Sequence, residues 1–361
     1  LGRGKVQIGI PGLIEMVAFP KVRTCWSFIK TYVNENQRLE VALELKNDSK
    51  KTVNAELISD VYLRGKKIKS IARRSVNITT GKITKLNLTK SWTDPLLWEP
   101  ENPTLYELRT TLLSNGKVID IRRDRFGFRE IGIDGRFITI NGKKFHLYGT
   151  GHFAARSKIW PMVPSPQRIF RYFQRPEDHW GCGVDDGYIA DEMGIMAKFE
   201  DYLNQALHSP RYAYQLDITW DRIYQQMHNS FRSRPNNPSN VIWDIGNELR
   251  FDRKGEKEKM GKLYAKIRKY DPTRLVTNSG GSNEVPGARI VDNHNNASMW
   301  NRWPYWFTHQ EKRPFYLKSA GVYSHSEKDG QKWYELDKVH LGFYGLLPGY
   351  NREQCDKLYH V

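Results

Sequence analysis

Residues 240–248 read Asn-Val-Ile-Trp-Asp-Ile-Gly-Asn-Glu. The run is rich in β-branched and aromatic residues and too short for an ordinary helix, so it predicts a buried strand. Gly246 then lets the backbone bend, and Asn247 and Glu248 follow where the strand stops. In a barrel of parallel strands, chemistry lies at the carboxyl ends of the strands. Glu248 is therefore either a proton-transfer group there or the cap of a following helix.

The wider stretch, residues 237–248, closely resembles the acid/base signature of glycoside hydrolase family two. That family includes β-galactosidases, β-glucuronidases and β-mannosidases. The resemblance implies that Glu248 is the general acid/base and that Asn247 binds the sugar 2-hydroxyl. It also implies an exo-acting glycosidase of β-galactosidase or β-glucuronidase type, which retains the anomeric configuration if its nucleophile is intact. This chemistry requires no metal and no organic cofactor.

The composition limits the partners of this chain. Its 361 residues carry a formal charge of +17 and a pI of about 9.6. The Lys and Arg residues are scattered and no nucleic-acid motif appears, so we expect a solvated basic surface, with an acidic substrate as the functional alternative. A nucleic-acid binder would rest on charge alone. No stretch is long and apolar enough to span a bilayer, so we expect no membrane partner. We also expect no nucleic-acid partner, and the resemblance implies a carbohydrate substrate.

We expect three regions: residues 1–20, 21–133 and 134–361. The first resembles the end of the sugar-binding jelly-roll domain that lies at the amino terminus of family-two enzymes. Most of that domain is absent from this sequence. The second contains short strands of alternating polarity separated by turns, which predicts an immunoglobulin-like β-sandwich. The third is expected to be a TIM (β/α)8 barrel, abbreviated or distorted at its end. The predicted sandwich strands are residues 38–45, 53–58 and 86–88.

Two further segments resemble the family where its sandwich meets its barrel. Residues 98–108 match a Trp-x-Pro-x-x-Pro-x-Leu-Tyr pattern, in which prolines stiffen a bend before the last hairpin. Residues 137–145 predict a hairpin whose Asn-Gly pair is the favoured two-residue turn. The first barrel strand would follow over residues 146–152. His152 at its end is either structural or a substrate ligand.

The barrel pattern continues with amphipathic helices at 218–234 and 257–270. Residues 271–277 contain the stop of the second helix and the fifth strand, and residues 290–294 are the sixth strand. Residues 188–200 resemble the family's helix-Gly-strand unit. The pocket candidates include Glu200 at the end of that strand, for which an ordinary structural carboxylate is the alternative, and His294 at the end of the sixth strand. Trp303 lies among three Trp residues, of which one either stacks on a sugar or belongs to the core. His179 is a poorer candidate, because the residues around it make a poor strand.

Retaining glycosidases need a second carboxylate roughly 5 Å from the first. The resemblance places this nucleophile at the end of the strand over residues 313–321, where the sequence has Ala320. Three explanations stay open: a deliberate nucleophile knockout, a natural pseudoenzyme, or a shifted strand in which Glu327 attacks. The alternative to an enzyme is therefore a carbohydrate-binding protein that uses the same cleft without turnover.

The remaining expectations concern the form of the protein. The chain begins Leu1-Gly2-Arg3-Gly4, without an initiator Met or a signal peptide, so we expect a processed or truncated piece. We favour a periplasmic or secreted location for the protein. The residues do not decide between a monomer and a homo-oligomer.

Overall fold

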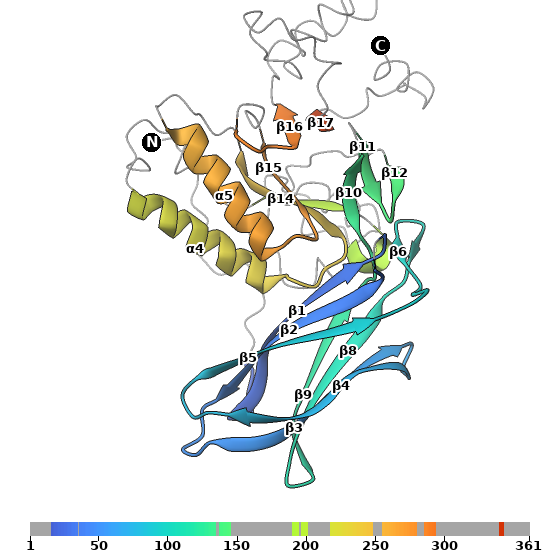
Figure 1. Ribbon diagram of the computed structural model, residues 1–361, viewed down its shortest axis with the longest axis vertical. Helices are drawn as coiled ribbons and strands as arrows, with labels where there is room; N and C mark the ends of the chain where they lie inside the picture. The colour runs from blue at the N-terminus through green and yellow to red at the C-terminus, as the bar shows by residue number, and fades with distance from the viewer. Residues whose placement is uncertain are drawn as a thin grey trace, which may run out of the picture.

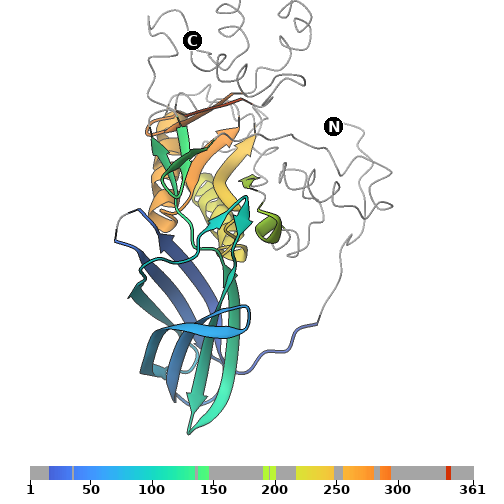
Figure 2. The same cartoon turned by 90° about the vertical axis from the view of Figure 1, so that its right-hand side faces the viewer.

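The protein has two parts, one made of strands and one in which helices cover strands (Figure 1). The computed structural model describes residues 16–34, 36–134, 137–145, 190–194, 196–200, 217–247, 255–279, 285–293 and 339–342. In the lower part of the view, the described elements are strands of a sandwich. In the upper part, helices α4 (Asp217–Ser233) and α5 (Glu256–Tyr270) lie against a parallel sheet. Figure 2, a quarter turn away, shows the same two parts end to end.

The sandwich consists of a three-stranded and a four-stranded antiparallel sheet. The first has the order β1 (Val22–Tyr32), β2 (Arg38–Asn47), β5 (Ile83–Ser91). The second has the order β4 (Lys66–Ile78), β3 (Val53–Leu63), β8 (Tyr106–Ser114), β9 (Lys117–Phe126). Along β2 every second residue is buried. This three-plus-four arrangement is that of an immunoglobulin-type sandwich, so the predicted β-sandwich is confirmed.

The core between the two sheets explains why these strands form. Its fully buried aliphatic side chains alternate with polar ones along the strands, which is the pattern of sheets with one wet face. They include Leu39, Leu43, Leu45, Leu57, Ile78 and Leu108. The three predicted strands fall within β2, β3 and β5. The short predicted strand at 86–88 is a nine-residue strand, because β5 pairs with β2 along almost its whole length.

A small sheet connects the sandwich to the barrel. It contains β10 (Ile131–Asp134), β11 (Phe137–Ile140) and β12 (Lys143–Phe145) in antiparallel order. Between β11 and β12, Asn141 and Gly142 have φ of 53° and 79°. Positive φ at both central residues is what a type I′ turn requires, so the predicted hairpin is confirmed. Its isoleucines join a core cluster with Ile242 and Ile290, which anchors the hairpin to the barrel strands.

The barrel part contains parallel strands, as its sequence pattern predicts. One sheet has the order β13 (Ala197–Glu200), β14 (Asn240–Asn247), β15 (Leu275–Ser279), and β16 (Ile290–Asn293) pairs in parallel with β17 (Val339–Gly342). Both expected outer helices are present, as α4 and α5. They pack their apolar faces against one side of β14. The chain therefore joins a β-sandwich to part of a TIM-barrel domain, of which the described residues form an incomplete set of strands.

The stretch over residues 271–277 contains both the predicted helix stop and the predicted strand. Helix α5 ends at Tyr270, and β15 starts at Leu275. The side chain of Asp271 accepts hydrogen bonds from the backbone nitrogen and the hydroxyl of Thr273, at 2.9 and 2.7 Å. An aspartate that bonds two residues ahead closes a local turn, which competes with strand formation.

The three predicted domain ranges stay predictions. Residues 1–15 lie outside the described part, residues 16–20 form no regular element, and the boundary expected at 133 falls inside β10. Residues 190–193 are helical and end at Gly194, whose φ is 68°, as expected for a helix that stops before a strand. Among the described helices, none combines the length and the apolar character needed to cross a bilayer.

Candidate active site

The carboxyl ends of three parallel strands meet at one edge of a sheet in the barrel part. β13 ends at Glu200, β14 at Asn247 and β15 at Ser279, while β16, which belongs to a separate two-stranded sheet, ends at Asn293. Asn247 pairs with Ser279 across the β14–β15 ladder, after a register shift that begins at Asp244. Such an irregularity re-aims the chain where a strand ends, which is the place that barrel enzymes use for chemistry. Glu248 is the next residue along the chain and lies outside the described part.

The two faces of β14 differ in what they contact. Trp243 and Ile245 pack against the helices, whereas Ile242 packs with Ile290 of β16. Because side chains alternate along a strand, Asp244 lies on the same face as Ile242, away from the helices. Asp244 is fully buried, and its Oδ2 is 2.7 Å from Nζ of Lys198 on β13. An ion pair between a fully buried carboxylate and a half-buried ammonium group thus joins these two strands four residues before Glu248.

The predicted site residues fall into two groups. Glu200 and Asn247 are the last residues of neighbouring parallel strands, so the fold brings their backbones to one edge. Glu248, Glu327, His152, His294, Trp303, Ala320 and His179 lie outside the described residues. His294 directly follows the last residue of β16. Glu248 and His294 are therefore the immediate continuations of two described strands, and their roles stay predictions.

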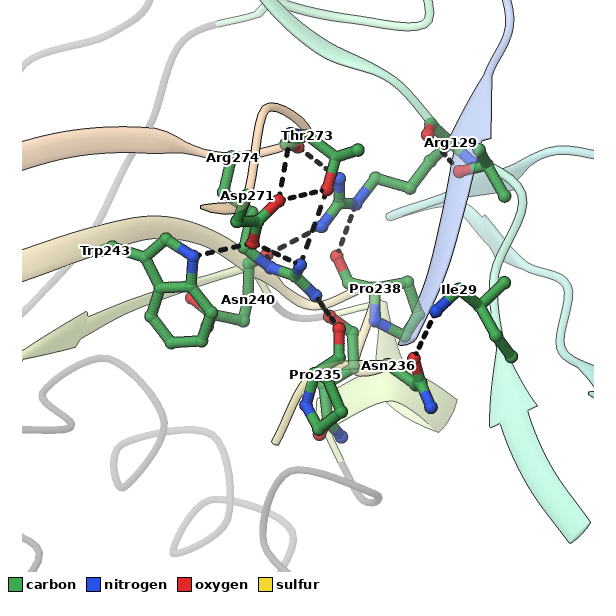
Figure 3. A network of polar contacts seen from close by, with 12 residues as sticks. Ile29, Arg129, Pro235, Asn236, Pro238, Asn240, Trp243, Asp271, Thr273 and Arg274 are labelled. Carbon is green, nitrogen blue, oxygen red and sulfur yellow. Dashed lines mark hydrogen bonds and ion pairs between the residues drawn. The ribbon is translucent and has the colours of Figure 1, made fainter. Parts of the chain in front are cut away.

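A buried polar network holds the opposite end of β14, where the strand begins (Figure 3). Sequence reasoning missed this cluster, which gathers residues far apart in the chain. Its central groups are Arg129, which follows β9, and Asp271 and Arg274, which follow α5. Each is at most 5% exposed. Charged residues are almost never this buried without partners. The cluster therefore has a structural role, which the composition of the chain does not reveal.

Arg274 makes the largest set of contacts in this network. Its Nη1 donates to Oδ2 of Asp271 at 2.8 Å, and its Nε donates to the carbonyl of Asn240 at 2.9 Å. Its Nη2 donates to the carbonyls of Pro235 and Asn237, both at 2.9 Å. One guanidinium therefore fixes the backbone that leads into β14, as Figure 3 shows.

Asp271 is ionised beside Arg274 although it is fully buried. Burial favours the neutral acid, but the charge of Arg274 and hydrogen bonds from Thr273 and Trp243 outweigh it and hold the pKa of Asp271 below its ordinary value. The indole nitrogen of Trp243 donates to Asp271 Oδ2 at 2.7 Å. Because Trp243 belongs to β14, the carboxylate anchors the strand as well as its entry loop.

Arg129 clamps the same loop from the sandwich side. Its Nε, Nη1 and Nη2 donate to the carbonyls of Pro238, Thr273 and Asn240 at 2.9, 2.9 and 2.7 Å. Burial, together with the nearby charge of Arg274, lowers the pKa of Arg129 to about 9, which leaves it charged at neutral pH. The sandwich thus fixes the start of the strand that ends beside Glu248.

Asp191 holds the loop before β14 from a third direction. Its carboxylate accepts hydrogen bonds from Nδ2 of Asn237 at 2.7 Å and from the backbone nitrogen of Ser239 at 3.0 Å. Its backbone carbonyl accepts one from the indole of Trp98 at 2.8 Å. Burial raises the pKa of Asp191 from 3.8 to about 6, because these hydrogen bonds and the charge of Arg125 offset burial only in part.

Replacing Asp191 by Asn is expected to remove a pH dependence of stability. Since the folded-state pKa lies above the unfolded one, the folded state binds more protons between about pH 4 and pH 6. The stabilisation is complete below pH 4 and is lost as pH rises through 6, by roughly 3 kcal/mol. Urea unfolding between pH 4 and 7 should show this loss in the natural chain and not in Asp191→Asn. Asp94→Asn, at an exposed position, is the control. Parallel curves for Asp191→Asn and the natural chain would contradict the assignment.

No metal centre is apparent within the described ranges. Three or more His, Cys, Asp or Glu side chains do not gather there in a way that would hold an ion. Several candidate ligands, His152 and His294 among them, lie outside those ranges, so the expectation that no cofactor is required stays a prediction.

The fold and the strand ends define a class: a β-sandwich joined to a barrel whose candidate chemistry lies at the carboxyl ends of its parallel strands. The comparisons with known proteins identify the family. The chain belongs to glycosyl hydrolases family 2, whose first model matches residues 26–129 and whose TIM barrel domain model matches residues 187–320. The resemblance seen in the sequence is confirmed.

Curated relatives share modest identity with the chain. A β-galactosidase from Leuconostoc mesenteroides is 22% identical over 299 residues, which cover 77% of this chain and 28% of that protein. A putative β-glucuronidase from Formosa agariphila is 26% identical over 266 residues, or 66% of this chain and 30% of that protein. The chain thus spans less than a third of the length of these curated relatives.

A solved structure supports the same fold. The β-galacturonidase from Eisenbergiella tayi, solved with galacturonate bound, has a TM-score of 0.62 and 17% identity, and the match covers 81% of this chain and 55% of that one. At this identity the likeness shows the architecture alone.

Proposed function

We propose that the protein is a glycosidase that hydrolyses terminal β-linked sugars, with Glu248 as its general acid/base. The observation that carries the proposal is the end of β14. This strand of a family-two barrel stops at Asn247, beside the end of β15, so the next residue continues from the edge where barrel enzymes place their catalytic groups. Asn247 would bind the sugar 2-hydroxyl.

The proposed chemistry is retaining hydrolysis. Glu248, protonated in the resting enzyme, would give its proton to the glycosidic oxygen as the bond to the sugar breaks. After the departure of the leaving group, the same carboxylate would accept a proton from the attacking water. In the first step a nucleophilic carboxylate would bond to the anomeric carbon as the leaving group departs, and in the second step the water would displace that carboxylate. Glu327 is the candidate for it, since Ala320 has no group that can attack.

The substrate class follows from the relatives and the charge. The names of the similar proteins include β-galactosidase, β-glucuronidase and β-galacturonidase, so the sugars are galactose-like or uronic acids. The formal charge of +17 favours an acidic polysaccharide as the natural source of these sugars, because a cationic surface attracts anionic polymers. We therefore propose a β-galactosidase or β-glucuronidase type of activity.

The test is turnover of chromogenic β-galactoside, β-glucuronide and β-galacturonide by the full chain. Release of the chromophore above the buffer rate, with the β-anomer as first product by NMR, supports the proposal. Release of the α-anomer first would exclude retention. No release from any of the three substrates, together with no binding of the free sugars, would remove the proposed function.

The second candidate is a carbohydrate-binding protein without turnover, and Ala320 is the observation that favours it. In that case calorimetry detects sugar binding while no chromophore is released. Ala320→Glu separates the two candidates. Turnover that appears only in Ala320→Glu identifies the natural chain as inactive, whereas turnover in the natural chain that Glu327→Gln abolishes places the nucleophile at Glu327.

A further inference from the structure

One segment of the sandwich has an unusual charge composition. Residues 61–93 contain nine Lys or Arg residues and no Asp or Glu. The cations are Arg64, Lys66, Lys67, Lys69, Arg73, Arg74, Lys82, Lys85 and Lys90. All of them except the half-buried Lys69 are exposed. The protein as a whole has 40 acidic residues against 57 basic ones, so a segment of this length without a carboxylate is out of proportion to the composition.

The segment forms one edge of the sandwich. It contains β4 and β5, which are the edge strands of the two different sheets. A short turn joins the end of β4 to the start of β5, and Nζ of Lys69 on β4 lies 5.3 Å from the ring centre of Trp92, just past the end of β5. The two strands therefore run side by side, and we call them the basic edge. The 13 residues of β4 give it a length of about 40 Å.

Neighbouring carboxylates neutralise the basic edge only in part. Lys67 pairs with Asp60 and Arg73 with Glu56, both at 2.6 Å, whereas Lys85 is 3.9 Å from Glu44. Within the described part of the chain, no carboxylate lies within ion-pair distance of the other exposed cations of the edge. These are Arg64, Lys66, Arg74, Lys82 and Lys90. A row of uncompensated positive charge thus faces solvent along both strands.

Protection of the sheet edges explains part of this pattern. Charged side chains and bulges prevent edge strands from pairing with other chains, and β4 carries two register shifts against β3. Protection does not require a single sign, however. Charges of both signs would serve equally well, and they would avoid the repulsion between like charges on adjacent strands. The exclusive use of cations points to an anionic partner.

We propose that the basic edge binds a linear acidic polysaccharide and so holds the enzyme on its polymer, away from the barrel. The proposal rests on the proposed function for its choice of polyanion. A long edge with repeated cations suits an extended chain that carries a carboxylate or sulfate at regular intervals. Neither β4 nor β5 contains an aromatic residue, which argues against single-stranded nucleic acid, because such binding uses aromatic rings on which bases stack.

The experiment compares two variants of the full chain by affinity electrophoresis in gels that contain polygalacturonate or neutral dextran. The first variant combines Lys66→Gln, Arg74→Gln, Lys82→Gln and Lys90→Gln. The control combines Arg222→Gln, Lys262→Gln, Lys269→Gln and Arg289→Gln, which removes the same charge from exposed positions in the barrel part. At about 50 mM salt we expect about tenfold weaker polygalacturonate binding and a shallower salt dependence in the first variant only. Dextran should retard neither variant.

Three results would overturn the proposal. One is a natural chain that polygalacturonate does not retard at low salt. Another is an equal loss of binding in both variants, which would make the attraction a property of net charge. The third is binding to duplex DNA that is tighter than binding to polygalacturonate at equal salt. Turnover of a small chromogenic glycoside is measured in parallel. That substrate is too small to contact the basic edge and the barrel at once. A loss of its turnover therefore tests the proposed function, whereas a loss of retardation by polygalacturonate tests the basic edge.

Discussion

Replacing Glu248 by Gln is expected to lower kcat for a chromogenic β-glycoside by about 10²–10⁴-fold, the usual contribution of a positioned general acid/base. The amide has nearly the same shape but cannot give up a proton to the leaving oxygen. The measurement is made in whichever form turns the substrate over, the natural chain or Ala320→Glu. Substrate binding should change little, because the uncharged amide still fits the same space.

The identity of the leaving group makes this test sharper. A glycoside whose leaving group needs no protonation, such as a dinitrophenolate, should recover most of the lost rate of the bond-breaking step. Glu258→Gln is the matched control, since Glu258 is exposed in the first turn of α5 and no ion pair with it is seen in the described part of the chain. Unchanged turnover in Glu248→Gln, or a loss that the better leaving group does not reduce, would remove Glu248 from the acid/base role.

Replacing Arg274 by Met is expected to lower the free energy of unfolding by about 3–5 kcal/mol. The change leaves the carboxylate of Asp271 buried without its counter-ion. It also removes the guanidinium donor from the carbonyls of Pro235 and Asn237 in the loop before β14, whereas the carbonyl of Asn240 keeps its hydrogen bond from Arg129. Met has a similar length and an apolar stem, so the loss of stability measures the removal of the guanidinium group rather than the creation of a cavity. Urea unfolding followed by tryptophan fluorescence measures the effect, since Trp243 bonds to Asp271.

Arg222→Met is the matched control for this prediction. Arg222 is exposed on α4, and the same substitution there should change stability by less than about 0.5 kcal/mol. The double variant Arg274→Met with Asp271→Leu removes both charges and should be more stable than Arg274→Met alone, because an uncompensated buried charge costs more than an absent pair. If the double variant is no better, the loss comes from the carbonyl partners and not from the charge of Asp271.

Some elements were predictable because their signal is local. The Asn141-Gly142 turn, the strand β14 and the helices α4 and α5 all follow from a short window in which turn chemistry or apolar periodicity is explicit. The edge strands β4 and β9 carry no such signal. Only a few of their residues are buried in the core, among them Ile71 and Ile78 of β4 and Phe126 of β9, so the regular alternation of polar and apolar residues that marks β2 is missing from them.

The amino-acid sequence alone predicts the family, the sandwich-plus-barrel architecture, and the position of Asn247 and Glu248 at the end of a barrel strand. Those conclusions depend on residues that are neighbours in the chain. Tertiary structure alone decided that Arg129, Asp191, Asp271 and Arg274 converge on the loop before that strand, and that Lys198 pairs with Asp244. These groups are up to 145 positions apart, and a charged residue shows its burial only when distant segments pack around it. Sequence spacing carries no record of that packing.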